Sequence, residues 1–249
     1  MITNYREIIC SHYDPKTLRL KPFNIVEYVF YYQSSADDKL LLDELIGKGY
    51  DLATKVNPGA ANDSARRRTF EIIISNCVAG LIAEFCWQHF LNDGGSQIRV
   101  TSVPFETANF QIDLRTIKNS KTIEVRSSFP RAPIEKVICN RDCQFDVIGP
   151  YKNSYKPDEI QKDFYVRALF RMDNPRQVLT NVKTDNFVAY LTGGATWAMI
   201  ADDAIAIEKA LTPSDEISEK KIYSRSTYRV VPFCYALDTL EIKQIISTL

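Results

Sequence analysis

The segment NFQIDLRTIKNSKTIEVRSSF, residues 109–129, gives the clearest local pattern in this protein. Its two halves, 109–117 and 121–129, are rich in β-branched residues and partly alternate between apolar and polar side chains, which predicts two strands. The polar pair Lys118-Asn119 lies between the halves and is typical of a turn. The segment therefore predicts an antiparallel hairpin.

The register of this hairpin places two acids opposite each other. If Ile117 pairs with Ser120 across a two-residue turn, the numbers of paired residues add to 237, and a four-residue loop over the same positions gives the same register. Asp113 and Glu124 then face each other, with Cβ atoms about 5 Å apart. Arg126 shares the face of Glu124 because side chains alternate along a strand. Two opposed like charges destabilise a hairpin, so a divalent cation held by carboxylate oxygens would make the arrangement favourable.

A third acid lies on a helix predicted upstream. Over residues 64–91 apolar side chains recur at steps of three and four, which predicts one apolar helix face, with a kink near Gly80. Glu84 lies about two turns after Cys77 and points with that face toward the core. A buried carboxylate is unfavourable unless it is paired or bound to a metal. The N-cap candidates of the helix are Asn62, Asp63 and Ser64.

Taken together, these residues resemble a known signature. Glu84 followed by D113-x10-E124-V-R126 is similar to the active site of the PD-(D/E)xK nuclease superfamily, to which many type II restriction endonucleases belong. That superfamily has an Asp at the end of one strand and an acid-x-Lys on the next, and a preceding helix commonly carries a Glu. The segments G80-L-I-A-E84, 163–170 and 189–196 are also similar, so the resemblance covers about residues 64–210.

The resemblance implies an α/β fold with a restriction-endonuclease-like core, a mixed central β-sheet flanked by helices. Asp113 and Glu124 would bind Mg²⁺, and the backbone carbonyl of Val125 would be a further ligand. Glu84 would hold or position a metal or a water molecule. The implied reaction is hydrolysis of a phosphodiester bond by a metal-activated water.

Arg126 departs from the family pattern, because it occupies the position of the family lysine. A lysine can shift its pKa and help to orient or deprotonate the attacking water, whereas arginine stays charged. Three alternatives follow. Arg126 supplies only electrostatic stabilisation of the transition state, Lys121 reaches into the site instead, or activity is weak or absent. Ile112 stands where the family often has Pro, a common departure.

The segments outside the hairpin and the long helix have less distinctive sequence patterns. Residues 23–32 form a buried helix or strand, and residues 37–56 form a helix with a turn at Gly47 and Gly49. Residues 130–160 are predicted as a loop region and 196–211 as a helix. A single nuclease domain is predicted over 1–249, with a mostly helical N-terminal part at 1–62, a catalytic core at 64–210 and a C-terminal part at 211–249.

The composition excludes several classes of protein. Of 249 residues, 31 are Lys or Arg and 31 are Asp or Glu, so the formal net charge is zero and indiscriminate coating of DNA is unfavoured. Six scattered cysteines predict free buried thiols in a reducing, cytoplasmic compartment. The Cys139-x3-Cys143 spacing and the two histidines, His12 and His89, do not favour a zinc site or a His-dependent hydrolase. No signal peptide and no membrane span are predicted.

Positive charge is nevertheless segregated along the chain. Residues 193–219 carry a net charge of minus five, whereas 220–231 hold four cations, Arg229 among them, and no acid. Arginine, lysine and asparagine can contact phosphates and base edges, although any surface loop can contain them. The candidate DNA-binding residues are Arg66, Arg67, Arg68, Arg131, Asn140, Arg141, Lys220, Lys221 and Arg225.

The sequence therefore predicts a Mg²⁺-dependent, site-specific endonuclease that acts on double-stranded DNA, as a homodimer on a short palindrome, beside a cognate DNA methyltransferase. Asp113 and Glu124 bind metal, Glu84 assists and Arg126 stabilises charge. One alternative is a DNA-binding protein on the same fold that has lost catalysis. Another is an α/β protein, either a small-molecule enzyme or a structural domain, that binds no nucleic acid.

Overall fold

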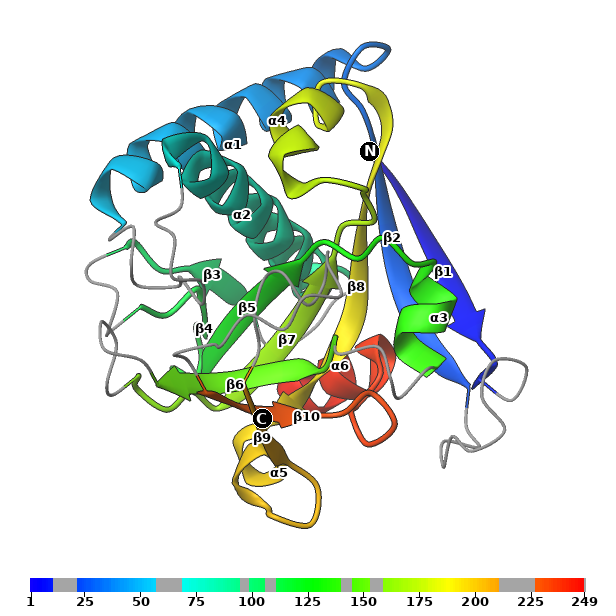
Figure 1. Cartoon of the computed structure of the whole chain (residues 1–249), viewed down its shortest axis with the longest axis vertical. Coiled ribbons are helices and arrows are strands. Elements are labelled where there is room, and N and C mark those ends of the chain that lie inside the picture. The colour runs from blue at the N-terminus through cyan, green and yellow to red at the C-terminus, as the bar shows by residue number, and fades with distance from the viewer. Residues whose placement is uncertain are drawn as a thin grey trace.

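The protein is built around a mixed sheet of seven strands, with a separate sheet of three strands on one face (Figure 1). The α/β class and the mixed central sheet flanked by helices are thereby confirmed, whereas a restriction-endonuclease-like core stays a prediction. The computed structural model describes residues 1–10, 22–56, 69–94, 99–105, 111–139, 145–152, 159–210 and 227–248.

The large sheet has the order β1-β2-β8-β7-β5-β4-β3. All of its neighbouring strands run antiparallel except β5 and β7, which are parallel. The small sheet has the antiparallel order β6-β10-β9. The strands are β1 Ile2–Ile8, β2 Phe23–Tyr31, β3 Val100–Ser102, β4 Leu114–Thr116, β5 Thr122–Ser128, β6 Val147–Lys152, β7 Phe164–Leu169, β8 Asp185–Thr196, β9 Ile207–Ala210 and β10 Thr227–Val231.

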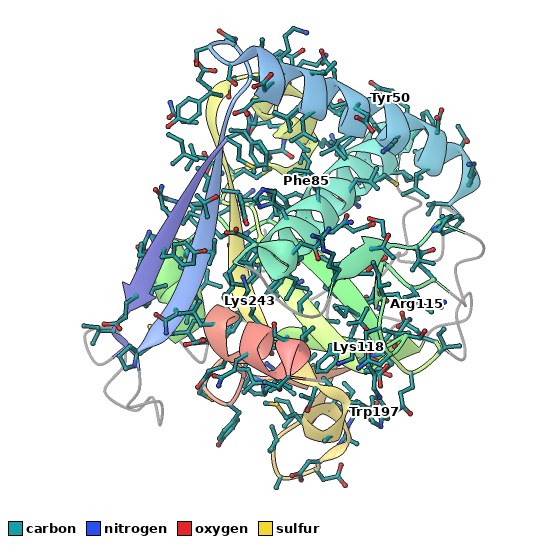
Figure 2. The ribbon with its side chains drawn as sticks, turned by 180° about the vertical axis from the view of Figure 1, so that it is seen from behind. Tyr50, Phe85, Arg115, Lys118, Trp197 and Lys243 are labelled. Carbon is teal, nitrogen blue, oxygen red and sulfur yellow. A yellow bond between two sulfur atoms is a disulfide. The ribbon has the colours of Figure 1, made fainter. Side chains whose placement is uncertain are left out.

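Helices cover the large sheet on both faces. On one face α2 contacts β3, β5 and β8 and is itself covered by α1, while α6 lies against β2 and β8 (Figure 2). On the other face α3 and the small sheet enclose a second apolar cluster. The helices are α1 Ala36–Lys55, α2 Phe70–Asn92, α3 Ile134–Cys139, α4 Val178–Asn181, α5 Trp197–Ala201 and α6 Thr239–Ser247, with a 3₁₀ turn η2 at Pro175–Gln177.

The N-terminal part is not mostly helical, which corrects that prediction. Residues 2–8 and 23–31 form β1 and β2, the two outer strands on one side of the large sheet. Aromatic and β-branched residues of β2 are buried on both of its faces, since α6 and α2 pack on one side and the small-sheet layer on the other. This double burial explains why residues 23–32 lack the alternation that distinguishes a strand from a helix.

The helix α2 begins later and is straighter than the sequence indicates. Its N-cap is Thr69, whose hydroxyl accepts a hydrogen bond from the N–H of Ile72, and not Asn62, Asp63 or Ser64. The helix continues without a break through Gly80. The predicted start was therefore too early. The predicted kink was wrong because tertiary packing along the helix outweighs the weak local propensity of one glycine.

The helix α1 likewise continues through both of its glycines. A Cβ atom at Gly49 would lie 2.4 Å from Cγ2 of Val78 in α2, whereas a Cβ atom at Gly47 would meet nothing within 4 Å. Gly49 therefore permits close approach of the two helices and does not mark a turn. The pattern cannot separate these two uses of glycine, since the partner helix is distant in sequence.

Two further predictions of local structure were wrong. The region 130–160 contains α3 and β6 among its described residues, and the helix predicted at 196–211 ends at Ala201 and is followed by β9. Both new strands belong to the small sheet, whose pairing with β10 is non-local. Local pattern alone does not reveal strands that are stabilised mainly by such pairing.

Two cysteines form a disulfide in place of the predicted free thiols. Cys10, just after β1, is bonded to Cys139 at the end of α3, and both are buried. The prediction rested on scattered spacing, which carries no information about contacts between residues 129 positions apart. Cys143, the second member of the Cys-x3-Cys pair, lies outside the described residues.

By length and composition α2 is apolar enough to cross a membrane, with a mean hydropathy of 1.5 over an 18-residue window. Half of that window is buried inside the protein. At its C-terminal end Lys243 of α6 donates hydrogen bonds to the carbonyl oxygens of Phe90 and Asp93, at 2.6 and 3.0 Å. Such burial between a sheet and two helices is typical of the core helix of a soluble protein.

Candidate active site

The β4–β5 hairpin has the register that the sequence predicts. Leu114 pairs with Ile123 and Arg115 with Thr122, so paired residue numbers add to 237. The turn is the four-residue alternative, because the N–H of Thr116 donates to the carbonyl of Lys121 at 2.9 Å. The ladder ends at Leu114, one residue before the two acids would pair. The register is confirmed, and the acids lie where the two strands separate.

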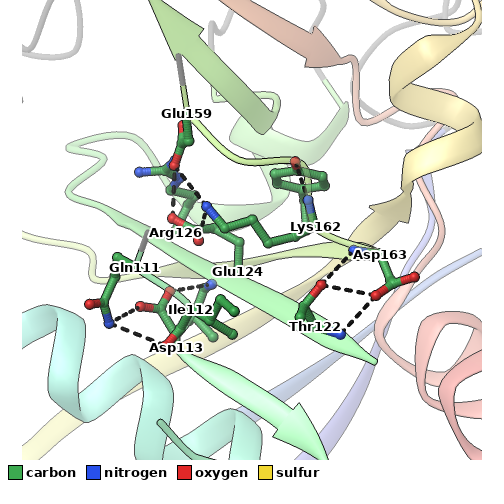
Figure 3. Close-up of polar contacts among 11 residues, drawn as sticks. Gln111, Ile112, Asp113, Thr122, Glu124, Arg126, Glu159, Lys162 and Asp163 are labelled. Atoms are coloured by element: carbon green, nitrogen blue, oxygen red, sulfur yellow. Dashed lines mark hydrogen bonds and ion pairs between the residues drawn. The ribbon is translucent and has the colours of Figure 1, made fainter. Parts of the chain in front are cut away.

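At this point Asp113 replaces the missing ladder bonds with side-chain bonds. Its Oδ2 accepts a hydrogen bond of 2.8 Å from the backbone N–H of Val125, and Nε2 of Gln111 donates to its Oδ1 at 3.3 Å (Figure 3). The carboxylate is therefore fixed against β5, directly beside Glu124.

Three carboxylates that are distant in sequence influence one another here. Burial raises the pKa of Asp113 well above its ordinary value, and the charges of Glu124 and Glu84 raise it further. The hydrogen bond from the Val125 N–H and the charge of Arg126 lower this pKa, but by less. Burial also raises the pKa of Glu84 to about 7, and the charge of Glu124 adds to this, while a hydrogen bond with Ser102 and the charge of Lys48 oppose it. The structure thus brings Glu84 of α2 into the same electrostatic environment as the hairpin acids.

Glu124 is 3% exposed and contacts two cations. Its Oε1 lies 3.0 Å from Nη2 of Arg126, and its Oε2 lies 3.2 Å from Nζ of Lys162. Lys162 lies just before β7, the parallel neighbour of β5, and its backbone N–H donates to the hydroxyl of Tyr165 at 3.1 Å. The side chain of Lys162 is fully buried, which requires carboxylate partners.

The second partner of both cations is Glu159. Nη2 of Arg126 donates to its two carboxylate oxygens at 2.7 and 2.9 Å, and Nζ of Lys162 donates to its Oε1 at 3.2 Å (Figure 3). The side chain of Glu159 is fully buried. A network of two acids and two cations results, in which each cation contacts both acids.

Lys121, one of the predicted substitutes for the family lysine, does not reach the site. Its Nζ pairs with Oδ1 of Asp163 at 2.8 Å, and Thr122 also hydrogen-bonds to Asp163. Sequence reasoning missed Glu159 and Lys162. The available signal was a lysine directly before the segment 163–170, which resembles the nuclease superfamily, but the parallel pairing that brings this lysine to Glu124 cannot be read from the sequence.

The charges around the site do not balance. If all groups were ionised, the site would hold two more negative than positive charges, which a low-dielectric environment disfavours. Either protons or a divalent cation would remove this excess. The groups are the acids Glu84, Asp113, Glu124 and Glu159 and the cations Arg126 and Lys162.

The donor chemistry fits a hard divalent cation. Within the described part of the chain, the buried Oε1 of Gln111 accepts no hydrogen bond, and the buried Oε2 of Glu124 contacts Nζ of Lys162 at 3.2 Å only as an ion pair, without hydrogen-bond geometry. Mg²⁺ takes oxygen ligands and is usually bound through one or two carboxylates together with substrate phosphates. Across those residues no three Asp, Glu, His or Cys side chains are grouped to hold a metal ion, so the site is not a preformed cage. The carbonyl of Val125 stays a predicted ligand.

The predicted DNA-binding residues lie mostly outside the described residues. Arg131 is exposed at the end of β5, and its Nε donates to the carbonyl of Asp173 at 2.8 Å. Arg229 of β10 pairs with Asp203, so the charge of the predicted basic segment is partly neutralised there. The candidates outside the described residues are Arg66, Arg67, Arg68, Asn140, Arg141, Lys220, Lys221 and Arg225.

Comparisons with known proteins give little guidance. No protein-family model and no solved structure matches this chain. A curated protein of Methanocaldococcus jannaschii, described as Uncharacterized protein MJECS01, is 31% identical over 121 residues. The match covers 44% of this chain and 43% of that protein, so it spans less than half of either.

Proposed function

We propose that this protein is a metal-dependent, sequence-specific DNA endonuclease of the type II restriction class. One observation carries the proposal: Asp113 and Glu124 lie where β4 and β5 separate, and the charge of Glu124 raises the pKa values of both Asp113 and Glu84 of α2. In a structural ion pair the buried charges balance, whereas here acids outnumber cations. A divalent cation would neutralise the excess negative charge, and the cations nearby could contact a phosphate.

The proposed roles follow from position. Asp113 and Glu124 would hold Mg²⁺, with the carbonyl of Val125 as a further ligand, and Glu84 would accept a hydrogen bond from a water bound near them. When bound, the ion supplies a water nucleophile and neutralises charge on the phosphate. Lys162 and Arg126 lie against Glu124, so they are positioned to stabilise negative charge that develops on the scissile phosphate.

The proposed partners are a second copy of the chain, double-stranded DNA and a DNA methyltransferase. Cleavage of both strands of a palindromic site favours a homodimer acting on double-stranded DNA. A cognate DNA methyltransferase would protect the host, and both would act in the cytoplasm. The buried disulfide between Cys10 and Cys139 is unusual for a mesophilic cytosol, where disulfides are rare.

The decisive experiment is cleavage of plasmid and phage DNA with MgCl₂, with and without EDTA. We expect discrete fragments from the wild type and a loss of about 100-fold or more in Asp113→Asn and Glu124→Gln. Glu44→Gln is the matched control, because Glu44 is an exposed helix residue paired with Lys48. Equal cleavage by the control and by the two site variants would contradict the assignment.

A second function has one observation in its favour. Arg126 replaces the family lysine, and its guanidinium is held by both oxygens of Glu159. A protein that binds specific DNA sequences without cutting them would tolerate this change. Sequence-specific retention of DNA fragments, with no cleavage in either Mg²⁺ or Mn²⁺, would favour this second function over the first.

A further inference from the structure

Glu159 is the one acid of the ion network that the nuclease signature does not contain. It enters from the segment before β7, and its side chain is fully buried. Its oxygens lie 2.7 and 2.9 Å from Nη2 of Arg126, and Oε1 lies 3.2 Å from Nζ of Lys162. These distances are no longer than those from the same cations to Glu124, which are 3.0 and 3.2 Å.

The two acids therefore compete for the same two cations. With Glu159 ionised, the four groups are neutral together, and each cation is shared. With Glu159 uncharged, both cations would be drawn to Glu124, and their positive charge would oppose any metal ion at its oxygens. Because Glu124, Glu159 and Lys162 are buried and Arg126 is only 20% exposed, solvent screens this competition weakly.

We infer that Glu159 is a positioning residue for the metal site: it holds Arg126 and Lys162 so that Glu124 can bind a divalent cation without expelling them. The two-oxygen contact with Arg126 fixes the plane of the guanidinium as well as its charge. This inference rests on the proposed function, because it assumes that Glu124 binds the metal. It assigns to Glu159 no contact with metal or substrate.

The test is the affinity of the full-length protein for Mn²⁺ without DNA, measured by titration calorimetry with MnCl₂. Glu159→Gln keeps the shape of the side chain and removes its charge. We expect its Mn²⁺ dissociation constant to rise about tenfold or more, while Glu159→Asp, which keeps the charge, stays within about threefold of the wild type. Glu27→Gln is the matched control, since Glu27 pairs with Arg6 at 2.7 Å away from the site; we expect no change there.

A charge-balanced double variant separates charge from packing. Glu159→Gln combined with Arg126→Gln removes one acid and one cation, so it should bind Mn²⁺ within about threefold of the wild type. If the single variant does not fold, this double variant provides the measurement. Equal affinity of Glu159→Gln and wild type, or a double variant as weak as the single one, would overturn the role of Glu159.

The failure of the proposed function looks different. In that case Mn²⁺ binding would be absent in the wild type, or unchanged in Asp113→Asn and Glu124→Gln. If those two variants lose Mn²⁺ binding and Glu159→Gln does not weaken it, the metal site stands and only the positioning role is wrong.

Discussion

The carboxylate of Asp113 accepts a hydrogen bond of 2.8 Å from the backbone N–H of Val125. This single contact joins the start of β4 to the middle of β5 at the point where the ladder between them ends. It orients Asp113 beside Glu124 and supplies a partner for an N–H that β4 no longer reaches. The hairpin is therefore closed by a side chain that is also a proposed metal ligand.

Replacing Asp113 by Asn should separate these two roles. The amide oxygen of Asn can still accept from Val125, and Asn lacks the charge that burial disfavours, so we expect an unfolding free energy in EDTA at pH 7 no lower than that of the wild type. Cleavage should fall about 100-fold or more because the amide is a weaker metal ligand than a carboxylate. Asp113→Ala, which loses the hydrogen bond as well, should be less stable. Urea unfolding beside a cleavage assay tests both statements.

The acids of the site should make stability depend on pH in an unusual direction. The folded protein raises the pKa of Glu84 from 4.5 to about 7, so between these values the folded state binds more protons than the unfolded state. The unfolding free energy must then fall as pH rises through this range and stay level above it. For Glu84 the loss is about 3 kcal/mol, and the raised pKa of Asp113 acts in the same direction.

This pH dependence is measurable by thermal unfolding in EDTA between pH 5 and 8. Glu84→Gln should be more stable than wild type at pH 8 and similar to it at pH 5, whereas Asp43→Asn, an exposed control whose partner is Lys39, should show the same pH dependence as wild type. A wild type that gains stability up to pH 8 would refute the mutual repulsion of the site acids.

Lys162 and Lys121 provide a matched pair of lysines. Lys162 is fully buried between Glu124 and Glu159, whereas Lys121 pairs with Asp163 at a side-chain exposure of 41%. Removing one partner of a buried network leaves uncompensated charge, so Lys162→Met should lose about 3–5 kcal/mol of unfolding free energy. Lys121→Met should lose less than about 1 kcal/mol. Similar losses in urea unfolding would contradict the buried network.

The disulfide between Cys10 and Cys139 should stabilise the protein measurably. It joins β1 to the end of α3 across 129 residues, beside an ion pair between Arg6 and Glu135. Reduction should lower the unfolding free energy by about 2–5 kcal/mol. The double variant Cys10→Ser with Cys139→Ser should lose the same amount and respond no further to reductant. Alkylation with mass spectrometry, before and after reduction, shows whether the bond is present.

The two glycines of α1 should respond in opposite directions to alanine. Gly47→Ala adds a methyl group to open space and improves helix propensity, so it should stabilise the protein by about 0.5–1 kcal/mol. Gly49→Ala places the methyl group against the backbone and side chain of Val78 and should destabilise it by about 1–3 kcal/mol. Thermal unfolding of the two variants tests the close packing of α1 on α2.

The β4–β5 hairpin, its register and the body of α2 could be predicted from local sequence patterns. A turn, an alternation of side chains and a helical period act over a few residues, so they appear directly in the pattern. The juxtaposition of Asp113 with Glu124 follows from that register. The predicted inward face of α2 was only partly right, because Phe70 is exposed and Cys77 and Glu84 are half-buried beside the buried face.

Only the tertiary structure decided the rest of the site. Lys162 and Glu159 reach Glu124 because β5 and β7 pair in parallel, and the connection between parallel strands leaves no local mark of which residues meet. The same reason applies to β1 and β2, which join the sheet beside β8, and to the disulfide between Cys10 and Cys139. These contacts depend on which surfaces are buried together, and burial is a property of the packed chain rather than of any one segment.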